Sequence, residues 1–224
     1  MSEKRRLTYG KIAIFVLTLF IVWSIQRLII RPVFLNQLND LWFEMIDSGT
    51  KILVWICPTI WMLKRFEKEV WVDLKEMFTN KPSWAITLCY LLFIGIIAFS
   101  VAIASGEGLR IREDFTLIML IAPVLVAGIT EELVFRGFIL NSLLKKMNKI
   151  FAMAIDAVLF AFIHYPIWIY LGFGLTTILI NSVFSIFFSI TLSHSLLKTK
   201  NLLVPVAMHM FYNFIVTIFV TFTV

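Results

Sequence analysis

Long apolar stretches separated by short polar segments make up most of the chain. A helix that crosses a bilayer needs about 20 consecutive, mostly apolar residues. Seven stretches predict such helices: 12–30, 49–63, 84–104, 115–144, 150–169, 172–193 and 202–222. The pattern therefore predicts an all-α, polytopic membrane bundle of seven transmembrane helices, or of eight if a re-entrant segment around 166–173 is counted.

Three segments depart from a simple pattern of spans and loops. The stretch 115–144 is longer than a bilayer requires, and Pro123 and Gly128 within it predict a kink or break. The segment 31–48 is too polar to span. The segment 64–81 mixes charges with apolar residues at helical spacing, which predicts an interfacial amphipathic helix; a solvated connector is the alternative.

Basic residues are distributed unevenly between the loops. One side of the predicted topology holds 14 of the 20 Lys and Arg residues: Lys4, Arg5, Arg6, Lys11, Lys64, Arg65, Lys68, Lys75, Lys81, Lys145, Lys146, Lys149, Lys198 and Lys200. Because positively charged loops stay in the cytoplasm, the N-terminus is expected there and, with seven spans, the C-terminus outside. The net charge of +6 then reflects orientation, and no nucleic-acid partner is expected.

Composition agrees with a membrane protein. Apolar residues make up 60% of the chain, charged residues 15%, and the mean hydropathy is +0.93. These values exclude a soluble globular enzyme, a disordered tail and a disulfide scaffold. Cys57 and Cys89 lie in apolar runs and are interpreted as packing residues. No repeat or linker divides the chain, so residues 1–224 are expected to form one domain.

Ionisable side chains inside apolar spans are costly, and each is a candidate for function. The fourth stretch contains Glu131, Glu132 and Arg136. Glu132 and Arg136 are four residues apart, so they can pair on one helix face. Glu131 points about 100° away from that face and is expected to lack this partner, which suits a carboxylate to proton transfer. A structural Glu–Arg pair, with Glu131 also serving the arginine, is the alternative.

The fifth and seventh stretches each carry two candidate residues that are four positions apart. Phe160 and His164 lie in the fifth stretch, and His209 and Asn213 in the seventh. These residue types match a hydrolytic site, which needs bases and neutral donors to an oxyanion. Asp156 is expected to pair with a neighbouring helix, and His194 to lie at the cytoplasmic end of its helix.

The three ordered pairs resemble the motifs of the CPBP intramembrane proteases. The motifs are Glu131-Glu132-x-x-x-Arg136, Phe160-x-x-x-His164 and His209-x-x-x-Asn213, within a core of about 115–222. That family includes CAAX prenyl endopeptidases of the Rce1 type and bacterial proteins linked to bacteriocin processing or self-immunity. The resemblance does not extend to the N-terminal half.

The resemblance implies a role for each motif residue. Glu131 would activate the hydrolytic water with help from His164, while His209 and Asn213 would stabilise the oxyanion. Glu132, Arg136 and Phe160 would support the site. Family members are described both as metalloproteases and as glutamate-dependent proteases, so the cofactor is either absent or a divalent metal such as Zn²⁺ on Glu131, His164 and His209.

The expected function is that of an intramembrane endopeptidase. Its substrate would be a prenylated CAAX-type protein or a bacteriocin or pheromone precursor, and its partners that substrate and the lipid bilayer. A short chain fits the plasma membrane of a prokaryote. A non-catalytic immunity or regulatory protein is the first alternative, and a solute or proton carrier the second. The sequence carries no signal for oligomeric state.

Overall fold

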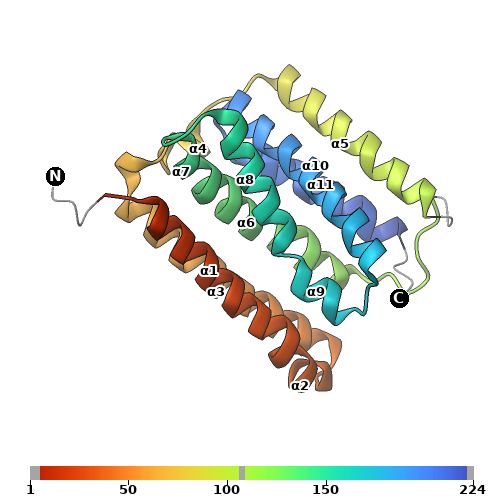
Figure 1. Ribbon diagram of the computed structural model, residues 1–224. Helices are drawn as coiled ribbons and strands as arrows, with labels where there is room; N and C mark the ends of the chain where they lie inside the picture. Colours follow the sequence, from red (N-terminus) through yellow and green to blue (C-terminus); the bar gives the residue numbers. More distant parts are fainter. Residues whose placement is uncertain (1–5, 106–108, 221–224) are drawn as a thin grey trace.

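The computed structural model describes residues 6–105 and 109–220, and the predicted positions of Lys4, Arg5 and Phe222 lie outside them. Seven helical rods follow one another along the described residues (Figure 1). They are α1 (Tyr9–Ile25) with η2 (Gln26–Ile30) and α2 (Arg31–Val33); α3 (Asp40–Arg65); α5 (Trp84–Ala104); η5 (Leu117–Leu120), η6 (Ile121–Val126), α6 (Ala127–Glu132), η7 (Leu133–Leu140) and α7 (Asn141–Leu144); α8 (Lys149–Phe162) with α9 (Tyr165–Tyr170); α10 (Leu175–Thr199); and α11 (Leu203–Phe219). Short turns η3 (Leu35–Gln37), η4 (Glu67–Glu69) and α4 (Glu76–Thr79) lie between them.

The chain is an all-helical membrane bundle, as the hydropathy pattern predicts. Five rods are long and apolar enough to cross a bilayer: Tyr9–Gln37, Trp84–Ala104, Leu117–Leu144, Lys149–Tyr170 and Leu175–Thr199. Each coincides with a predicted span. The rod Leu203–Phe219 is a shorter apolar helix, and α3 is too polar to meet the same criterion.

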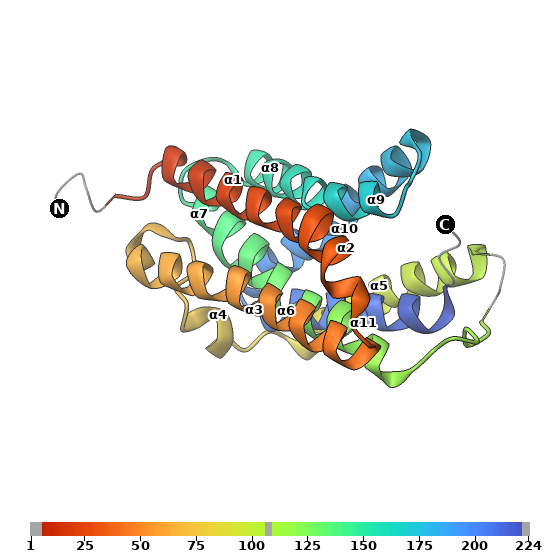
Figure 2. The same cartoon turned by 90° about the horizontal axis from the view of Figure 1, so that it is seen from below.

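The rods are arranged with the motif-bearing helices in the middle. The α1–α3 pair forms one edge of the bundle and α5 the opposite edge (Figure 1), and the view from below separates α1 from α3 (Figure 2). Helix α3 contacts η6, α6 and η7, α8 packs on α10, and α11 packs on α5 and α6. The central position of α6 and η7 allows side chains from four other rods to reach them.

Helix α3 differs from the predicted second span. It begins at Asp40, so the polar residues 40–48 belong to the helix rather than to a connecting segment. Asn39 caps the start, because its side chain accepts a hydrogen bond from the Trp42 amide. The polar residues Asp47 and Lys51 are buried and ion-paired within the bundle. These pairs offset part of the desolvation cost of burying the charged residues of the segment.

The segment 64–81 does not form the predicted amphipathic helix. Residues 64 and 65 end α3, the rest of the segment contains only η4 and α4, and its middle is held by tertiary hydrogen bonds. The Trp71 amide donates to the Asn141 carbonyl at 3.0 Å, the Val72 amide donates to Asn141 Oδ1 at 2.8 Å, and Asn141 Nδ2 donates to the Val72 carbonyl at 2.7 Å. Contacts with η7–α7 satisfy these backbone groups in place of helical hydrogen bonds.

The long fourth rod is irregular, as Pro123 and its length predict. Residues 121–126 and 133–140 have π-helical hydrogen bonding on either side of α6. Asn213 Nδ2 donates to the Pro123 carbonyl at 2.6 Å, so α11 binds the rod where proline disturbs it. At Gly128 an added Cβ would lie 2.4 Å from Met210 Cγ, and glycine therefore permits the close approach of α6 and α11.

Two further expectations need correction. Residues 166–170 form α9 within the fifth rod, and the chain then turns at Gly172, whose φ is +74°. No separate re-entrant segment is therefore formed by the described residues there. Cys57 and Cys89 are free and exposed on the outside of the bundle rather than packed inside it.

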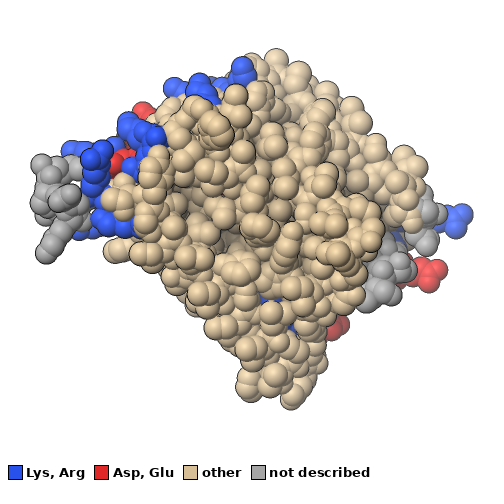
Figure 3. Space-filling model, viewed as in Figure 1, with Lys and Arg blue, Asp and Glu red and all other residues tan. Residues whose placement is uncertain are grey.

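Basic side chains gather at one end of the bundle (Figure 3). Several contacts join the predicted basic loops there: the Tyr9 hydroxyl donates to the Lys146 carbonyl, Lys146 pairs with Glu69 at 3.5 Å, and Asn80 donates to the Lys200 carbonyl. The grouping of these loops on one side agrees with the charge pattern of the sequence.

Candidate active site

Three rods bring the motif residues together in the middle of the bundle. Glu131 lies near the end of α6, His164 lies at the break between α8 and α9, and His209 lies on α11. Glu131 Oε2 is 3.7 Å from His164 Nε2 and 4.0 Å from His209 Nε2. The carboxylate and His209 are buried, and His164 retains partial exposure.

The helix break places His164. Helix α8 ends at Phe162, and Pro166 lies in the first turn of α9, where a missing amide proton costs no hydrogen bond. His164 Nδ1 is 2.8 Å from the Phe160 carbonyl, and its ring stacks on Trp168 at 5.6 Å. Because a carbonyl only accepts, Nδ1 carries the proton and Nε2 faces Glu131 as an acceptor.

His209 is oriented by a carboxylate instead. Its Nδ1 lies 2.7 Å from Glu132 Oε1, so Nδ1–H donates and Nε2 is directed towards Glu131. Glu131 Oε2 is buried and has no hydrogen-bond partner. A buried oxygen without a partner between two ring nitrogens is a site for a small polar molecule such as water.

A second buried network lies behind the histidines. Arg136 Nη1 is 3.2 Å from Glu132 Oε1, and Arg136 Nη2 donates to the Ser189 carbonyl at 3.1 Å. Arg136 Nε is 3.7 Å from Asp156 Oδ2, to which the Ser193 hydroxyl donates at 3.0 Å. The predicted Glu132–Arg136 pair and the pairing of Asp156 with a neighbouring helix are both present.

Glu131 does have a partner, contrary to the expectation from the sequence. Lys51 Nζ lies 2.6 Å from Glu131 Oε1, and both side chains are buried. The expectation was based only on residues of the helix that contains Glu131, whereas Lys51 lies on α3. Among the described residues, Arg136 does not pair with Glu131. The carboxylate partners of Arg136 are Glu132 and Asp156.

The polar residues of the N-terminal half were not predicted as part of the site. Asp47 accepts two hydrogen bonds from Arg27 Nη1, at 2.9 and 3.1 Å, and another from Gln26. Asp47 and Lys51 lie one helical turn apart on α3 and are both buried. An acidic and a basic residue four positions apart, next to an apolar run, are the sequence signal that identifies this pair in retrospect.

Phe160 packs against both histidines of the site. Its ring centroid is 5.0 Å from that of His164 and 6.0 Å from that of His209, and the Arg136 guanidinium lies 4.5 Å from it. The supporting position expected for Phe160 agrees with these contacts.

Asn213 and His194 form hydrogen bonds with groups other than Glu131, His164 and His209. One N–H of the Asn213 amide is used by Pro123, and a primary amide has two. His194 lies five residues before the end of α10, where its Nδ1 is 2.8 Å from the Tyr90 hydroxyl of α5. His194 therefore lies in the last two turns of α10, where it is an exposed contact between α10 and α5.

The candidate ligands do not fit a metal ion in this arrangement. Within the described ranges, no three His, Cys, Asp or Glu side chains are arranged to hold a metal. Glu131 Oε1 already binds the Lys51 ammonium, and a second cation next to it would be repelled.

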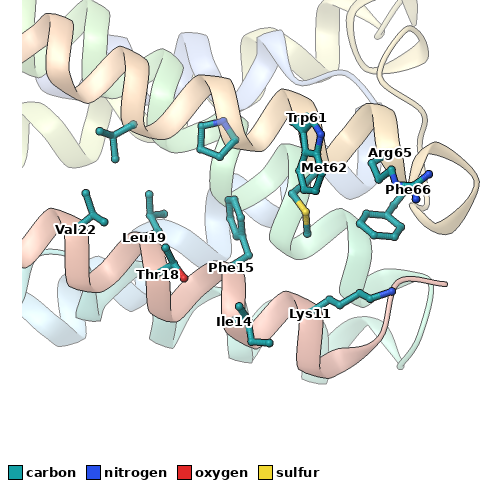
Figure 4. Close-up of a pocket in the computed structure, with 12 residues that line it drawn as sticks. Lys11, Ile14, Phe15, Thr18, Leu19, Val22, Trp61, Met62, Arg65 and Phe66 are labelled. Carbon is teal, nitrogen blue, oxygen red and sulfur yellow. The ribbon is translucent and has the colours of Figure 1, made fainter. Parts of the chain in front are cut away.

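An apolar groove of about 730 Å³ lies between α1 and α3 (Figure 4). Its walls come from both helices and include Phe15, Leu19, Val22 and Val54. Lys11 and Arg65 lie at the end with the basic loops. Val54, in the wall away from this end, lies three residues after Lys51 on α3.

Comparison with protein families agrees with the motifs. The family model for type II CAAX prenyl endopeptidases, Rce1-like, matches residues 113–215. This segment contains Glu131, His164, His209 and Asn213. Over residues 113–215 the chain is therefore similar to the Rce1-like family, and the resemblance to the CPBP proteases is confirmed. Comparisons with curated proteins and with solved structures found no significant match.

Proposed function

We propose that the chain is an intramembrane endopeptidase in which Glu131 activates water. The observation that carries this proposal is the buried, unpartnered Glu131 Oε2 between two histidine Nε2 atoms. The Rce1-like family supports a CAAX-type protease activity. The remaining elements of the mechanism are inferred from the contacts of each side chain.

Water would bind between Glu131 Oε2 and His164 Nε2, since both atoms accept hydrogen bonds. Glu131 takes a proton as the water oxygen attacks the carbonyl carbon of the scissile peptide bond. A bond forms between that oxygen and the carbon, and the carbonyl oxygen becomes an oxyanion. The C–N bond then breaks as the amide nitrogen takes the proton from Glu131, and a carboxylic acid and an amine are released. The acid then passes its proton to the amine, which gives a carboxylate and an ammonium group.

The oxyanion would be stabilised from α11. Glu132 accepts from His209 Nδ1 at 2.7 Å and so directs Nε2 towards the reacting carbonyl; with a proton on Nε2, His209 would donate to the oxyanion. Asn213 would donate the N–H that Pro123 does not use. Arg136 and Phe160 hold these groups in position.

Proteolysis by the purified protein tests this function. We expect a prenylated CAAX-type peptide to be cleaved by the wild type, and kcat/KM to fall about 10²-fold or more in His164→Ala and in His209→Ala. His194→Ala is the matched control, since His194 lies outside the site. Full activity of both site variants would contradict the proposed site.

We further propose that the substrate carries a lipid and that its chain lies in the groove between α1 and α3. The groove is apolar, and Val54 in its wall lies three residues, about one helical turn, after Lys51, which contacts Glu131. An unmodified precursor peptide would not need it. Lys11 and Arg65 at one end of the groove support a cytoplasmic position of that end. With seven spans, the C-terminus would then lie outside the cell.

A bulky side chain in the groove should affect the kinetics of lipidated and of unmodified substrates differently. In Val54→Trp we expect KM for a prenylated peptide to rise about tenfold, which corresponds to about 1.4 kcal/mol, while kinetics with the unprenylated peptide stay unchanged. Leu88→Trp on exposed α5 is the control. An equal change for both peptides would exclude the groove as the lipid site.

A further inference from the structure

Lys51 connects the N-terminal helices to the proposed general base. It lies on α3, outside the segment 113–215 that matches the family model. Its Nζ is 2.6 Å from Glu131 Oε1, and its side chain is 8% exposed. Burial of a lysine is costly unless its charge is paired. The only ion pair recorded for Lys51 among the described residues is the one with Glu131.

Two aromatic rings and a second ion pair hold Lys51 in place. Its ammonium lies 4.8 Å from the Trp55 ring centroid and 5.1 Å from that of Trp23. One turn earlier on α3, Asp47 is bound by Arg27 of η2 through both carboxylate oxygens. The Arg27–Asp47 pair therefore fixes α3 against the first rod, and Lys51 is held with little freedom.

This contact makes the two oxygens of Glu131 inequivalent. Oε1 is bound by Lys51, whereas Oε2 is left without a partner and faces the histidine Nε2 atoms. Without the ammonium, the carboxylate is free to rotate about its last bond and to turn either oxygen away from the histidines. Misplacement of a reacting group by about 1 Å can lower a rate about 10²-fold.

We propose that Lys51 is a positioning residue of the active site, which holds Glu131 so that one carboxylate oxygen remains directed at the hydrolytic water. The proposal rests on the proposed function. It implies that the active site is completed by α3, and that the segment 113–215, which matches the family model, lacks one part of the site.

Steady-state kinetics with the full-length chain test the proposal. In Lys51→Met we expect kcat to fall about 10²-fold with KM unchanged, because the lysine acts on Glu131 and not on the substrate. Lys51→Arg keeps a cation and should retain a higher kcat than Lys51→Met. Lys64→Met, at an exposed position of the same helix, is the control and should match the wild type. Thermal unfolding in detergent identifies variants that fail to fold.

A double-mutant cycle distinguishes positioning from a general structural effect. If Lys51 acts through Glu131, Lys51→Met should cause no further loss in a Glu131→Gln background. Additive losses, a change in KM alone, or a wild-type kcat in Lys51→Met would overturn the role of Lys51 and leave the proposed function intact. Should Lys51→Met not fold, Lys51→Arg decides, since a longer guanidinium should lower kcat at constant KM and a wild-type kcat would overturn the proposal. Absence of hydrolysis by the wild type would overturn both.

Discussion

Replacement of Glu131 with Gln is expected to lower kcat/KM for a cleaved peptide by about 10²–10⁴-fold. Glutamine has nearly the same shape and keeps an oxygen for Lys51, but its amide cannot take a proton from water. The histidines retain their own anchors, because His164 is bound by the Phe160 carbonyl and His209 by Glu132. The loss should therefore appear in the chemical step and not in the fold.

Two controls define the interpretation of Glu131→Gln. Glu67→Gln changes an exposed glutamate outside the site and should leave the kinetics unchanged. The thermal midpoint of Glu131→Gln in detergent should show that the variant is folded at the assay temperature. Activity close to that of the wild type in a folded Glu131→Gln protein would mean that another group is the base and that Glu131 has no catalytic role.

Replacement of Arg136 with Met is expected to cause the largest loss of stability, about 3–5 kcal/mol of the free energy of unfolding. Arg136 is fully buried and lies between two carboxylates, Glu132 and Asp156, and it also donates to the Ser189 carbonyl. Methionine fills a similar volume but leaves the acidic groups without their cation. The cost is that of uncompensated buried charge rather than of a cavity.

Unfolding in detergent micelles, followed by helix content, measures this loss. Arg110→Met, at an exposed position, is the matched control and should change the midpoint little. Adding Asp156→Asn to Arg136→Met removes one of the uncompensated charges and should recover part of the stability. An unchanged midpoint in Arg136→Met, or a double variant less stable than the single one, would contradict a charge-compensating role.

Much of the fold could be predicted because helix formation in a membrane depends on local properties of the chain. Hydropathy over about 20 residues located five spans, and Pro123 indicated an irregular fourth rod. Two departures from the local pattern share a cause. Asp47 and Asn141 form hydrogen bonds with distant segments, and residues 40–48 are helical whereas residues 64–81 do not form one continuous helix.

The candidate site could also be predicted only in part from the sequence. The spacings of Glu132 and Arg136, Phe160 and His164, and His209 and Asn213 were sufficient to identify the motif residues. The pairing of Glu132 with Arg136 follows from helical periodicity. The contact of Lys51 with Glu131, 80 positions apart in the chain, does not follow from any periodicity.

The amino-acid sequence by itself determined that the chain is a helical membrane protein and which three motifs bear the ionisable residues. The tertiary structure alone decided how these residues meet: which oxygen of Glu131 is bound, which ring nitrogen of each histidine faces it, and that helix α3 supplies the cation. The physical reason is the range of the interactions. Hydropathy and helical spacing act within one segment, whereas ion pairs between helices depend on which faces pack together.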